Sequence, residues 1–478
     1  MLLSKILNIE SNIEITGIQT DSRFIKKGNV FFAINGRSVK GISFVDKAIE
    51  QGAVAIVCDE NYTNDNIEVV KVNDVITSLG VALNNFYPQK PQHIIGITGT
   101  SGKTSVVEFT RQLIQSLNQN SASIGSLGFK FGNEYMKEDT LTMKELIDLH
   151  KNLDFLKSEK NVNYVAMEFT SQGLDQRRAE GIFPEIGVFL NITPEHLDYH
   201  TGMDDYFQKK MILFNNVLKR GSKAVINADI PEYDKIKAIC MANEHKILSF
   251  GYNGDIKIKS IKNSFEGQEA VLAYENKEYK FNTTFIGAFQ LMNLLAALSI
   301  VLQLDIEKDV NKILKSLENV KPADGRLQFA GKKKNGALIY VDYAHKPDAL
   351  EKMLKAMREH IKDDKEARLG VLFGCGGDRD KTKRPVMGQI ANELADFVIV
   401  TDDNPRTEIA EVIRSEIMTG CPNALNIENR KVAIEKAIDD LQPKDILVLA
   451  GKGHENYTII GKEIIPFDEF EIVKNAIN

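Results

Sequence analysis

The sequence has few cysteines, no long apolar segment and no excess of basic residues. Its four cysteines are far apart and form no CxxC pair, so we expect a reduced protein without disulfides or a zinc site: Cys58, Cys240, Cys375 and Cys421. No run approaches the roughly 18 uninterrupted apolar residues of a membrane span, and the N-terminus lacks the apolar core of a signal peptide. A formal net charge of −6 gives no global basic field for nucleic acid or acidic membranes. We therefore expect a cytoplasmic protein with small-molecule partners, no nucleic acid and no membrane insertion.

The 478 residues are 43% hydrophobic and 26% charged, which is typical of a globular protein with more than one core. Two segments with proline, 87–91 and 321–325, interrupt the pattern and favour linkers. They predict domains at 1–90, 91–325 and 326–478.

Short apolar runs alternate with amphipathic ones, which predicts an α/β protein with parallel sheets covered by helices. The predicted strands are 93–98, 164–169, 186–192, 223–227, 337–344, 368–374, 397–403 and 445–451. The predicted helices are 103–117, 144–156, 203–218, 288–302, 347–360, 385–395, 407–418 and 430–440. Ligands bind outside the carboxyl ends of the strands in such sheets, so polar motifs there are candidate sites.

Residues 96–105 read GITGTSGKTS and lie between an apolar strand pattern and a helical one. Glycines allow backbone N–H groups to close around phosphate oxygens, and the helix N-terminus favours an anion. Lys103 would supply a charge for the β- and γ-phosphates, and the Thr104 hydroxyl could ligate Mg²⁺. The loop departs from the strict pattern because Ile97 occupies a glycine position, and a plain glycine turn before a helix is the alternative. We expect a site for ATP or GTP.

Glu168 and His196 follow two further predicted strands. A carboxylate oxygen and an imidazole nitrogen near Thr104 could hold a divalent ion beside the γ-phosphate. The residues alone leave two alternatives open, a strand-end salt bridge for Glu168 and a helix cap or core hydrogen bond for His196.

These motifs occur in an order along nearly the whole chain that resembles the Mur ligases of peptidoglycan synthesis, most closely the MurE type. The family's G-x-T-G-T-N-G-K-T is matched at 96–104, with Ser101 for Asn, and its E-V-S-S-H-G-L at 168–174. Its D-H-L-D-Y-H-G, A-K-x-x-L-F and D-Y-A-H are similar to 195–202, 209–214 and 342–345. The resemblance implies a UDP-sugar-binding N-terminal domain, a central P-loop ATPase domain and a Rossmann-like C-terminal domain that binds the amino acid.

Residue by residue, the resemblance implies an ATP site, a Mg²⁺ site and a catalytic set. The ATP residues would be Gly99, Thr100, Ser101, Gly102, Lys103, Thr104, Ser105, Asn293, Arg326 and Asp342. Thr104, Glu168, His196 and Lys210 would serve Mg²⁺, with Lys210 converted by CO₂ to a carbamate (N6-carboxylysine). Lys103, Lys210, His196 and Glu168 would be the catalytic residues. Without the resemblance, Lys210 would read as a solvated lysine on a helix.

The two other substrates are assigned in the same way. The UDP-sugar-peptide would meet Ser22, Arg37, Ser38, Val39, Thr142, Thr170, Gln176 and Arg178. One departure is Met143-Lys144, where the family has a second threonine followed by proline or glycine. The amino acid would meet Arg379, Asp403, Asn404, Pro405, Arg406, Gly451 and Glu455. The Asp-Asn-Pro-Arg motif resembles that of ligases that add meso-diaminopimelate, because a guanidinium can grip a distal carboxylate that lysine lacks.

The resemblance implies a monomer that adds meso-diaminopimelate to UDP-N-acetylmuramoyl-L-alanyl-D-glutamate with ATP, through an acyl phosphate. Three alternatives stay open. A folylpolyglutamate synthase-like ligase shares the loop, a lysine-adding muramyl ligase shares the pathway, and a nucleotide-gated binding protein could have lost turnover. Amino-acid-dependent phosphate release would separate them.

Overall fold

A computed structural model describes residues 1–36, 39–59, 62–132, 134–136, 141–265 and 267–477. The chain divides into two compact units, Met1–Ser249 with Ser299–Ile306, and Phe250–Leu298 with Glu307–Asn478. The three domain boundaries predicted from the sequence stay a prediction. Among the described residues, no helix combines the length and the apolar character needed to cross a membrane.

The first unit begins with a four-stranded parallel sheet whose strands follow in chain order. The strands are β1 (Gly17–Gln19), β2 (Asn29–Phe32), β3 (Ala53–Cys58) and β4 (Glu68–Lys71). The helices around it are α1 (Leu3–Leu7), α2 (Val45–Glu50) and α3 (Val75–Phe86), with single 3₁₀ turns at Ser22–Phe24 and Gly41–Phe44. The carboxylate of Asp74 caps α3 by accepting from the backbone N–H of Thr77 at 2.8 Å.

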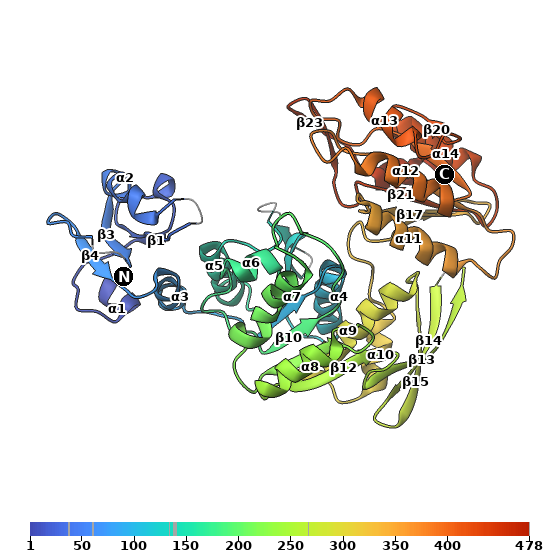
Figure 1. Ribbon diagram of the computed structural model, residues 1–478. Helices are drawn as coiled ribbons and strands as arrows, with labels where there is room; N and C mark the ends of the chain where they lie inside the picture. The colour runs from blue at the N-terminus through green and yellow to red at the C-terminus, as the bar shows by residue number, and fades with distance from the viewer. Residues whose placement is uncertain (37–38, 60–61, 133, 137–140, 266, 478) are drawn as a thin grey trace. The chain divides into compact units, whose positions relative to one another are not determined.

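The strands of the central sheet in the same unit follow the order β12-β11-β10-β5-β9-β6-β7-β8. The strands are β5 (His93–Thr98), β6 (Ser121–Gly125), β7 (Gly128–Phe131), β8 (Glu134–Met136), β9 (Tyr164–Glu168), β10 (Ile186–Phe189), β11 (Lys223–Asn227) and β12 (Lys246–Gly251). The helices are α4 (Lys103–Ser116), α5 (Leu146–Ser158), α6 (Ser171–Asp175), α7 (Met203–Ile212) and α8 (Tyr233–Ala242). Figure 1 labels β10 and β12 of this sheet and the helices α4, α5, α6, α7 and α8. The predicted strands at 93–98 and 223–227 are confirmed.

Two predicted elements of this region extend three or more residues beyond the observed ones. The strand expected at 186–192 ends at Phe189, and Pro194 follows in the loop, where it can donate no ladder hydrogen bond. The helix expected at 203–218 is α-helical only to Ile212 and continues as a π-turn over Leu213–Val217. Periodicity alone does not distinguish a π-turn from an α-helical turn.

The second unit contains an antiparallel meander and a six-stranded sheet. The meander is formed by β13 (Ile256–Ser264), β14 (Gly267–Tyr274) and β15 (Lys277–Thr283), and the sequence analysis missed it. The sheet has the order β16-β17-β21-β18-β19-β20, with the antiparallel strand β16 at its edge. Its strands are β16 (Gln328–Lys332), β17 (Leu338–Asp342), β18 (Leu369–Phe373), β19 (Phe397–Val400), β20 (Leu425–Asn426) and β21 (Ile446–Ala450).

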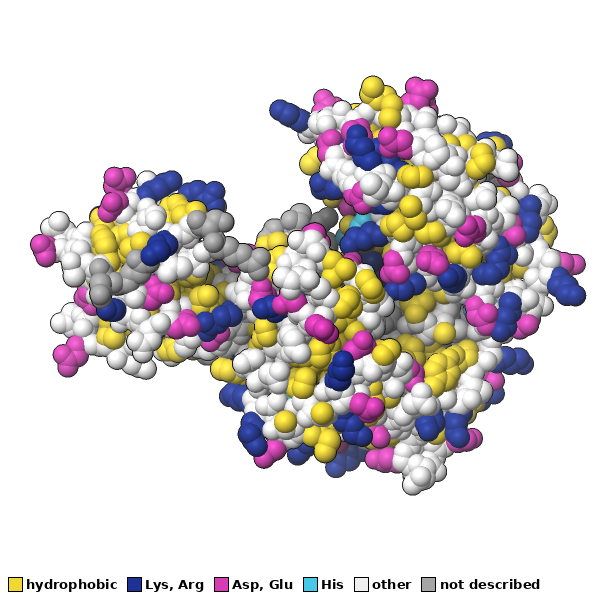
Figure 2. Space-filling view, in the orientation of Figure 1, with side chains coloured by type: hydrophobic (Ala, Val, Ile, Leu, Met, Phe, Trp, Pro, Cys, Tyr) yellow, Lys and Arg dark blue, Asp and Glu magenta, His cyan; other side chains and the backbone are white. Residues whose placement is uncertain are grey.

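Helices cover this sheet as the alternating pattern predicted. They are α11 (Pro347–His360), α12 (Lys383–Leu394), α13 (Ala410–Met418), α14 (Arg430–Asp440) and α15 (Glu469–Ala476). Two earlier helices, α9 (Ala288–Leu304) and α10 (Val310–Leu317), follow the meander in the chain and do not belong to this cover. A hairpin of β22 (Tyr457–Ile460) and β23 (Glu463–Pro466) completes the unit. Figure 2 shows acidic and basic side chains interspersed on the visible face.

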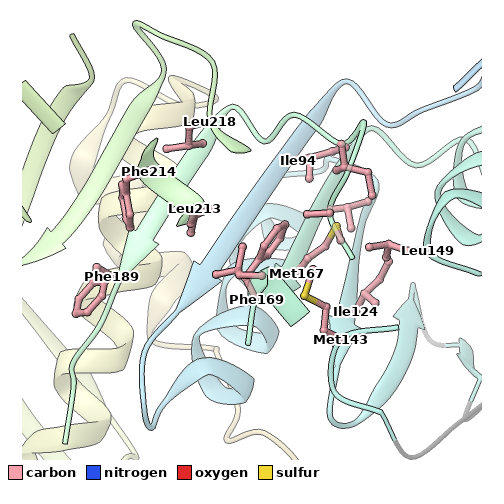
Figure 3. Packing of buried hydrophobic residues seen from close by; sticks show 14 of the residues in the cluster. Ile94, Ile124, Met143, Leu149, Met167, Phe169, Phe189, Leu213, Phe214 and Leu218 are labelled. Atoms are coloured by element: carbon pink, nitrogen blue, oxygen red, sulfur yellow. The ribbon is translucent and has the colours of Figure 1, made fainter. Parts of the chain in front are cut away.

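A buried apolar cluster fixes the central strands of the first unit. Phe189, Phe214 and Leu218 group beside β10, and Met167 and Phe169 come from β9 and the residue after it (Figure 3). Both faces of β9 and β10 are largely buried, which fits strands in the middle of a parallel sheet. The register places Phe189 beside Thr98 and Ile97 beside Glu168, so the carboxyl ends of β10, β5 and β9 adjoin.

One buried histidine gives this unit an expected sensitivity to acid. His150 on α5 is fully buried, and its Nε2–H donates to the carbonyl oxygen of Glu180 at 2.9 Å. Burial lowers the pKa of His150 from 6.5 to about 4. The unfolded chain therefore binds a proton in that interval that the folded chain rejects.

We predict that the free energy of unfolding falls as the pH drops from about 6.5 to about 4, because over that interval the unfolded chain binds a proton at His150 and the folded chain does not. Each pKa unit between the two states corresponds to about 1.4 kcal/mol. His150→Gln keeps a donor for Glu180 and removes the titration, so its unfolding free energy should fall less over that interval. Urea unfolding at pH 7.5, 5.5 and 4.5 measures this. If the free energy of unfolding fell equally in wild type and in His150→Gln, the acid sensitivity would not come from His150.

Candidate functional site

The glycine loop lies where the sequence predicted, between the end of β5 at Thr98 and the start of α4 at Lys103. Gly102 caps α4 with φ +82°, a left-handed conformation that side chains rarely adopt. A Cβ on Gly99 would lie 3.0 Å from Cβ of Leu190, so the neighbouring strand also limits this position to glycine. The strand and the helix thus hold the loop at the carboxyl edge of the sheet.

Two lysine ammonium groups meet at one backbone carbonyl of this loop. Nζ of Lys103 donates to the carbonyl oxygens of Gly99 at 2.8 Å and Thr100 at 2.9 Å. Nζ of Lys210, on α7, donates to the same Gly99 oxygen at 2.9 Å and lies 4.4 Å from the ring centroid of Tyr206. Burial lowers the pKa of Lys210 well below its usual value, and the charge of Lys103 lowers it further, against an opposing effect of Glu195. Lys210 is therefore buried beside the loop, and its ammonium group loses its proton at a lower pH than that of an exposed lysine.

A residue that the sequence analysis missed, Asn191, binds the loop from the end of β10. Its Oδ1 accepts from the backbone N–H of Ser101 at 2.9 Å, and its Nδ2 donates to the carbonyl oxygen of Ser101 at 3.1 Å. Its own carbonyl oxygen accepts from the N–H of Thr100 at 3.0 Å. The available signal was its position two residues after a strand that neighbours the loop.

Glu168 at the end of β9 is buried. Its Oε1 accepts from the backbone N–H of Ser126 at 2.7 Å, and a Cβ on Gly125 would lie 2.2 Å from that oxygen. The hydroxyl of Ser126 in turn lies 2.9 Å from the hydroxyl of Thr142. Ser126 thus connects Glu168, which the sequence analysis assigned to Mg²⁺, with Thr142, which it assigned to the UDP-sugar-peptide.

His196 lies in the loop after β10 with φ +57°, and its side chain is 42% exposed. Its Nε2 is 3.9 Å from Oε2 of Glu195. Within the described ranges, no group of three or more His, Cys, Asp or Glu side chains is placed to hold a metal ion. The predicted magnesium set contains only two such residues, so it also depends on the Thr104 hydroxyl and on modified Lys210. Hydroxyl and carboxylate oxygens are hard donors that fit Mg²⁺.

The residues predicted for the UDP-sugar-peptide are partly brought together. Arg178 donates to the carbonyl oxygen of Met143 at 2.8 Å and to Oε1 of Gln176 at 2.7 Å, and pairs with Glu145 at 2.9 Å. It therefore holds the backbone at the point where this chain departs from the family pattern. The hydroxyl of Thr170 caps α6 by accepting from the N–H of Gly173 at 3.0 Å.

The N-terminal members of that set are more scattered. Ser22 is buried in a 3₁₀ turn, and Val39 is half exposed. Arg37 and Ser38 lie outside the described residues.

The other predicted nucleotide residues lie in the second unit and form a network of their own. Nδ2 of Asn293 donates to Oε1 of Gln290 at 3.2 Å, and Nε2 of Gln290 donates to the carbonyl oxygen of Arg326 at 3.0 Å. Gln290, which the sequence analysis did not assign to the site, thus connects the two predicted residues.

Asp342 and Arg326 adjoin in the same unit. The carboxylate of Asp342 accepts from the N–H groups of Leu327 at 2.7 Å and Ala344 at 2.8 Å. Burial raises the pKa of Asp342, and the nearby Arg326 opposes that shift. The Arg326 guanidinium lies 4.9 Å from the ring centroid of Tyr343. Its bond to Ala344 lies before α11, whose N-cap is Lys346, and its bond to Leu327 ties Asp342 to the Arg326 segment.

The predicted amino-acid residues converge at the carboxyl ends of β19 and β21. Nδ2 of Asn404 donates to Oε2 of Glu455 at 3.0 Å, and Oδ1 of Asn404 accepts from Nζ of Lys452 at 3.2 Å. A Cβ on Gly451 would lie 2.8 Å from Oδ2 of Asp403. Burial and then the charge of Asp403 raise the pKa of Glu455. Lys452, fully buried among these groups, was not in the predicted set.

Arg406 adjoins this cluster with φ +50°. Its guanidinium donates to the carbonyl oxygen of Gly377 at 2.9 Å, and a Cβ on Gly377 would meet the carbonyl oxygen of Pro405 at 1.9 Å. A second glycine-rich loop, residues 374–377 after β18, therefore packs directly on the Asp-Asn-Pro-Arg segment, residues 403–406. Arg379 is exposed and donates to the carbonyl oxygen of Asp378 at 3.2 Å, so the structure does not bring it into a bond with the cluster.

Three family models match the chain in succession. They are described as Mur ligase family, catalytic domain, at 14–87; Mur ligase middle domain, at 97–301; and Mur ligase, glutamate ligase domain, at 325–453. The boundaries at 90 and 325 stay our prediction.

Curated relatives and solved structures agree with these matches. UDP-N-acetylmuramoyl-L-alanyl-D-glutamate--2,6-diaminopimelate ligases of Rickettsia montanensis and Mesorhizobium japonicum are each 39% identical, over 97% and 98% of this chain and 96% of theirs. A solved structure of a ligase with that name has a TM-score of 0.75 at 31% identity, covering 100% of this chain and 98% of its own. A folylpolyglutamate synthase of Mycobacterium tuberculosis, complexed with ADP, shares only the fold, at 18% identity and a TM-score of 0.62, over 78% of this chain and 91% of its own. The chain belongs to the Mur ligase family and has its three-domain α/β architecture.

Proposed function

We propose that this Mur ligase uses ATP to join meso-diaminopimelate to UDP-N-acetylmuramoyl-L-alanyl-D-glutamate in peptidoglycan synthesis. The observation that carries the proposal is the cluster of Arg406, Asn404, Asp403 and Glu455 on neighbouring loops of the second unit. A guanidinium beside two carboxylates, those of Asp403 and Glu455, complements the distal carboxylate and ammonium of a diamino diacid. Relatives whose names state that activity match over nearly the full chain.

The chemistry follows from the need to activate a carboxylate. An oxygen of the D-glutamyl carboxylate attacks the γ-phosphorus of ATP, an O–P bond forms, and ADP leaves with the electrons of the broken bond. The amine of diaminopimelate then attacks the acyl carbon, and phosphate leaves from a tetrahedral intermediate while the nitrogen loses a proton. Lys103 neutralises charge on the transferred phosphoryl group once it turns from the Gly99 carbonyl toward the nucleotide.

Thr104, Glu168, His196 and carbamylated Lys210 would hold Mg²⁺, which supplies positive charge to the phosphates when bound. The carbamate requires a neutral amine, because the nitrogen lone pair must attack CO₂ and release a proton. The buried Lys210, whose pKa lies well below its usual value, meets that requirement. Asn293, Arg326 and Asp342 would complete the ATP site, and the protein would act as a cytoplasmic monomer.

The first test is amino-acid-dependent phosphate release with purified protein, MgATP and UDP-N-acetylmuramoyl-L-alanyl-D-glutamate. We predict release with meso-diaminopimelate and little with L-lysine. Arg406→Ala should lower kcat/KM for diaminopimelate by roughly 10- to 100-fold, because a charge-assisted pair is worth about 1.5–3 kcal/mol. Arg358→Ala is the matched control, since Arg358 binds Asp396 and the Leu394 carbonyl away from the cluster. A preference for lysine, or nucleotide binding without phosphate release, would overturn the proposal.

The carbamate is tested separately. We predict that CO₂-depleted buffer lowers activity and that bicarbonate restores it, with a ¹³C carbamate resonance in protein incubated with labelled bicarbonate. Lys210→Met should lose both the resonance and most activity. Lys209→Met should keep the resonance, because the adjacent Lys209 pairs with Asp175 at 2.7 Å and is partly exposed. Unchanged activity in Lys210→Met would contradict the role.

A further inference from the structure

The side chain of Asn191 binds the glycine loop with a pair of hydrogen bonds like those between neighbouring strands. The β5–β10 pairing ends with Phe189 beside Thr98, and one more ladder bond follows, from the N–H of Leu190 to the carbonyl oxygen of Thr98 at 3.0 Å. Beyond it, the Asn191 side-chain amide pairs with both the N–H and the carbonyl oxygen of Ser101, at 2.9 Å and 3.1 Å. The contact therefore extends the sheet hydrogen bonding into a loop that has left the strand geometry.

The same asparagine also binds the loop through two further contacts. Its carbonyl oxygen accepts from the N–H of Thr100 at 3.0 Å, and its Oδ1 accepts from the Ser101 hydroxyl at 3.3 Å. The Thr100 hydroxyl in turn accepts from the N–H of Thr193 at 3.0 Å. Asn191 and Thr100 thus connect the loop to the segment that leads to His196.

This pairing divides the loop amides into two sets. The N–H groups of Thr100 and Ser101 already have acceptors on Asn191. The first intrahelical bond of α4 runs from Val106 to the Gly102 carbonyl at 2.9 Å. The N–H groups of the first helical turn have no acceptor inside the helix and point out of its N-terminus. The loop therefore offers its helical end, and not its first residues, to an anion.

We propose that Asn191 is a positioning residue for ATP. It holds Thr100 and Ser101 against β10, so that the triphosphate is bound by the N-terminal turn of α4 together with Lys103. Loss of the side-chain amide would free the start of the loop and increase the entropy lost when the nucleotide orders it. The inference rests on the proposed ATP-dependent function and adds a residue that acts through the loop backbone.

The test compares Asn191→Ala with Asn227→Ala. Asn227 ends β11, and its Nδ2 donates to the Leu190 carbonyl at 2.9 Å, so this control removes a similar strand-end amide without touching the loop. We expect Asn191→Ala to weaken MgATP binding, measured by calorimetry, by about tenfold or more. The KM for ATP should rise in parallel, while kcat and the KM values of the other substrates stay within about twofold. Asn227→Ala should bind MgATP within about twofold of wild type.

A second measurement needs no variant. Hydrogen exchange of the ATP-free wild-type protein should show the amides of Thr100 and Ser101 protected. Fast exchange of both amides, an Asn191→Ala protein with wild-type affinity, or equal weakening in both variants would overturn the inference. If wild-type protein binds no MgATP at all, the proposed function itself fails, which the calorimetry on wild type reveals first.

Discussion

The shared hydrogen bond of two lysines to one carbonyl oxygen, that of Gly99, is the constraint on which the first unit's site depends. Lys103 reaches it from the start of α4 and Lys210 from α7, at 2.8 Å and 2.9 Å. Two cations at one acceptor repel each other where little water screens them, and burial adds to that cost for Lys210. The arrangement is relieved when an anion draws Lys103 away or when Lys210 loses its positive charge. The first event would accompany the binding of a triphosphate, and the second is what the carbamate proposed at Lys210 requires.

The second unit uses buried charge differently. Lys452 lies among Asp403, Asn404 and Glu455 with no exposed surface, so its side chain organises the surrounding oxygens and has no access to solvent. Burial of this kind is costly unless the remaining groups are paired, and the Asn404 amide uses both ends to pair them. The result is a hydrogen-bonded cluster of opposite charges next to Arg406. Under the proposed function, such a cluster suits selection between amino acids that differ in one carboxylate.

The sequence predicted the features that depend on local pattern. Strand 93–98, the glycine loop and the following helix are confirmed, because an apolar run, Gly102 and an amphipathic stretch each leave a local signal. The structure adds that β9 and β10 both pair with β5, so the strand ends that carry these motifs adjoin. The roles predicted for Lys103 and Thr104 came from the loop pattern, and those of most other site residues came from the family resemblance; all of them stay predictions.

Features that depend on contacts distant in sequence could not be predicted. Asn191 binds Ser101 across 90 residues, and Gln290 binds Arg326 across 36. Neither residue carries a motif, because an asparagine after a strand is usually a turn residue. The meander β13–β15 was missed because continuous apolar runs were taken as the sign of strands, whereas β13 alternates isoleucine with lysine, as a half-buried strand does. The local sequence around Lys210 indicated a solvated lysine, because only the tertiary structure reveals that this residue is 1% exposed.

The most direct measurement of the central claim is calorimetric titration of MgATP into the purified protein and into Lys103→Ala. The account predicts saturable binding at one site in the wild-type protein and a loss of most of that affinity when the Lys103 ammonium is removed. Absence of binding in the wild-type protein, or equal affinity in the variant, would contradict it.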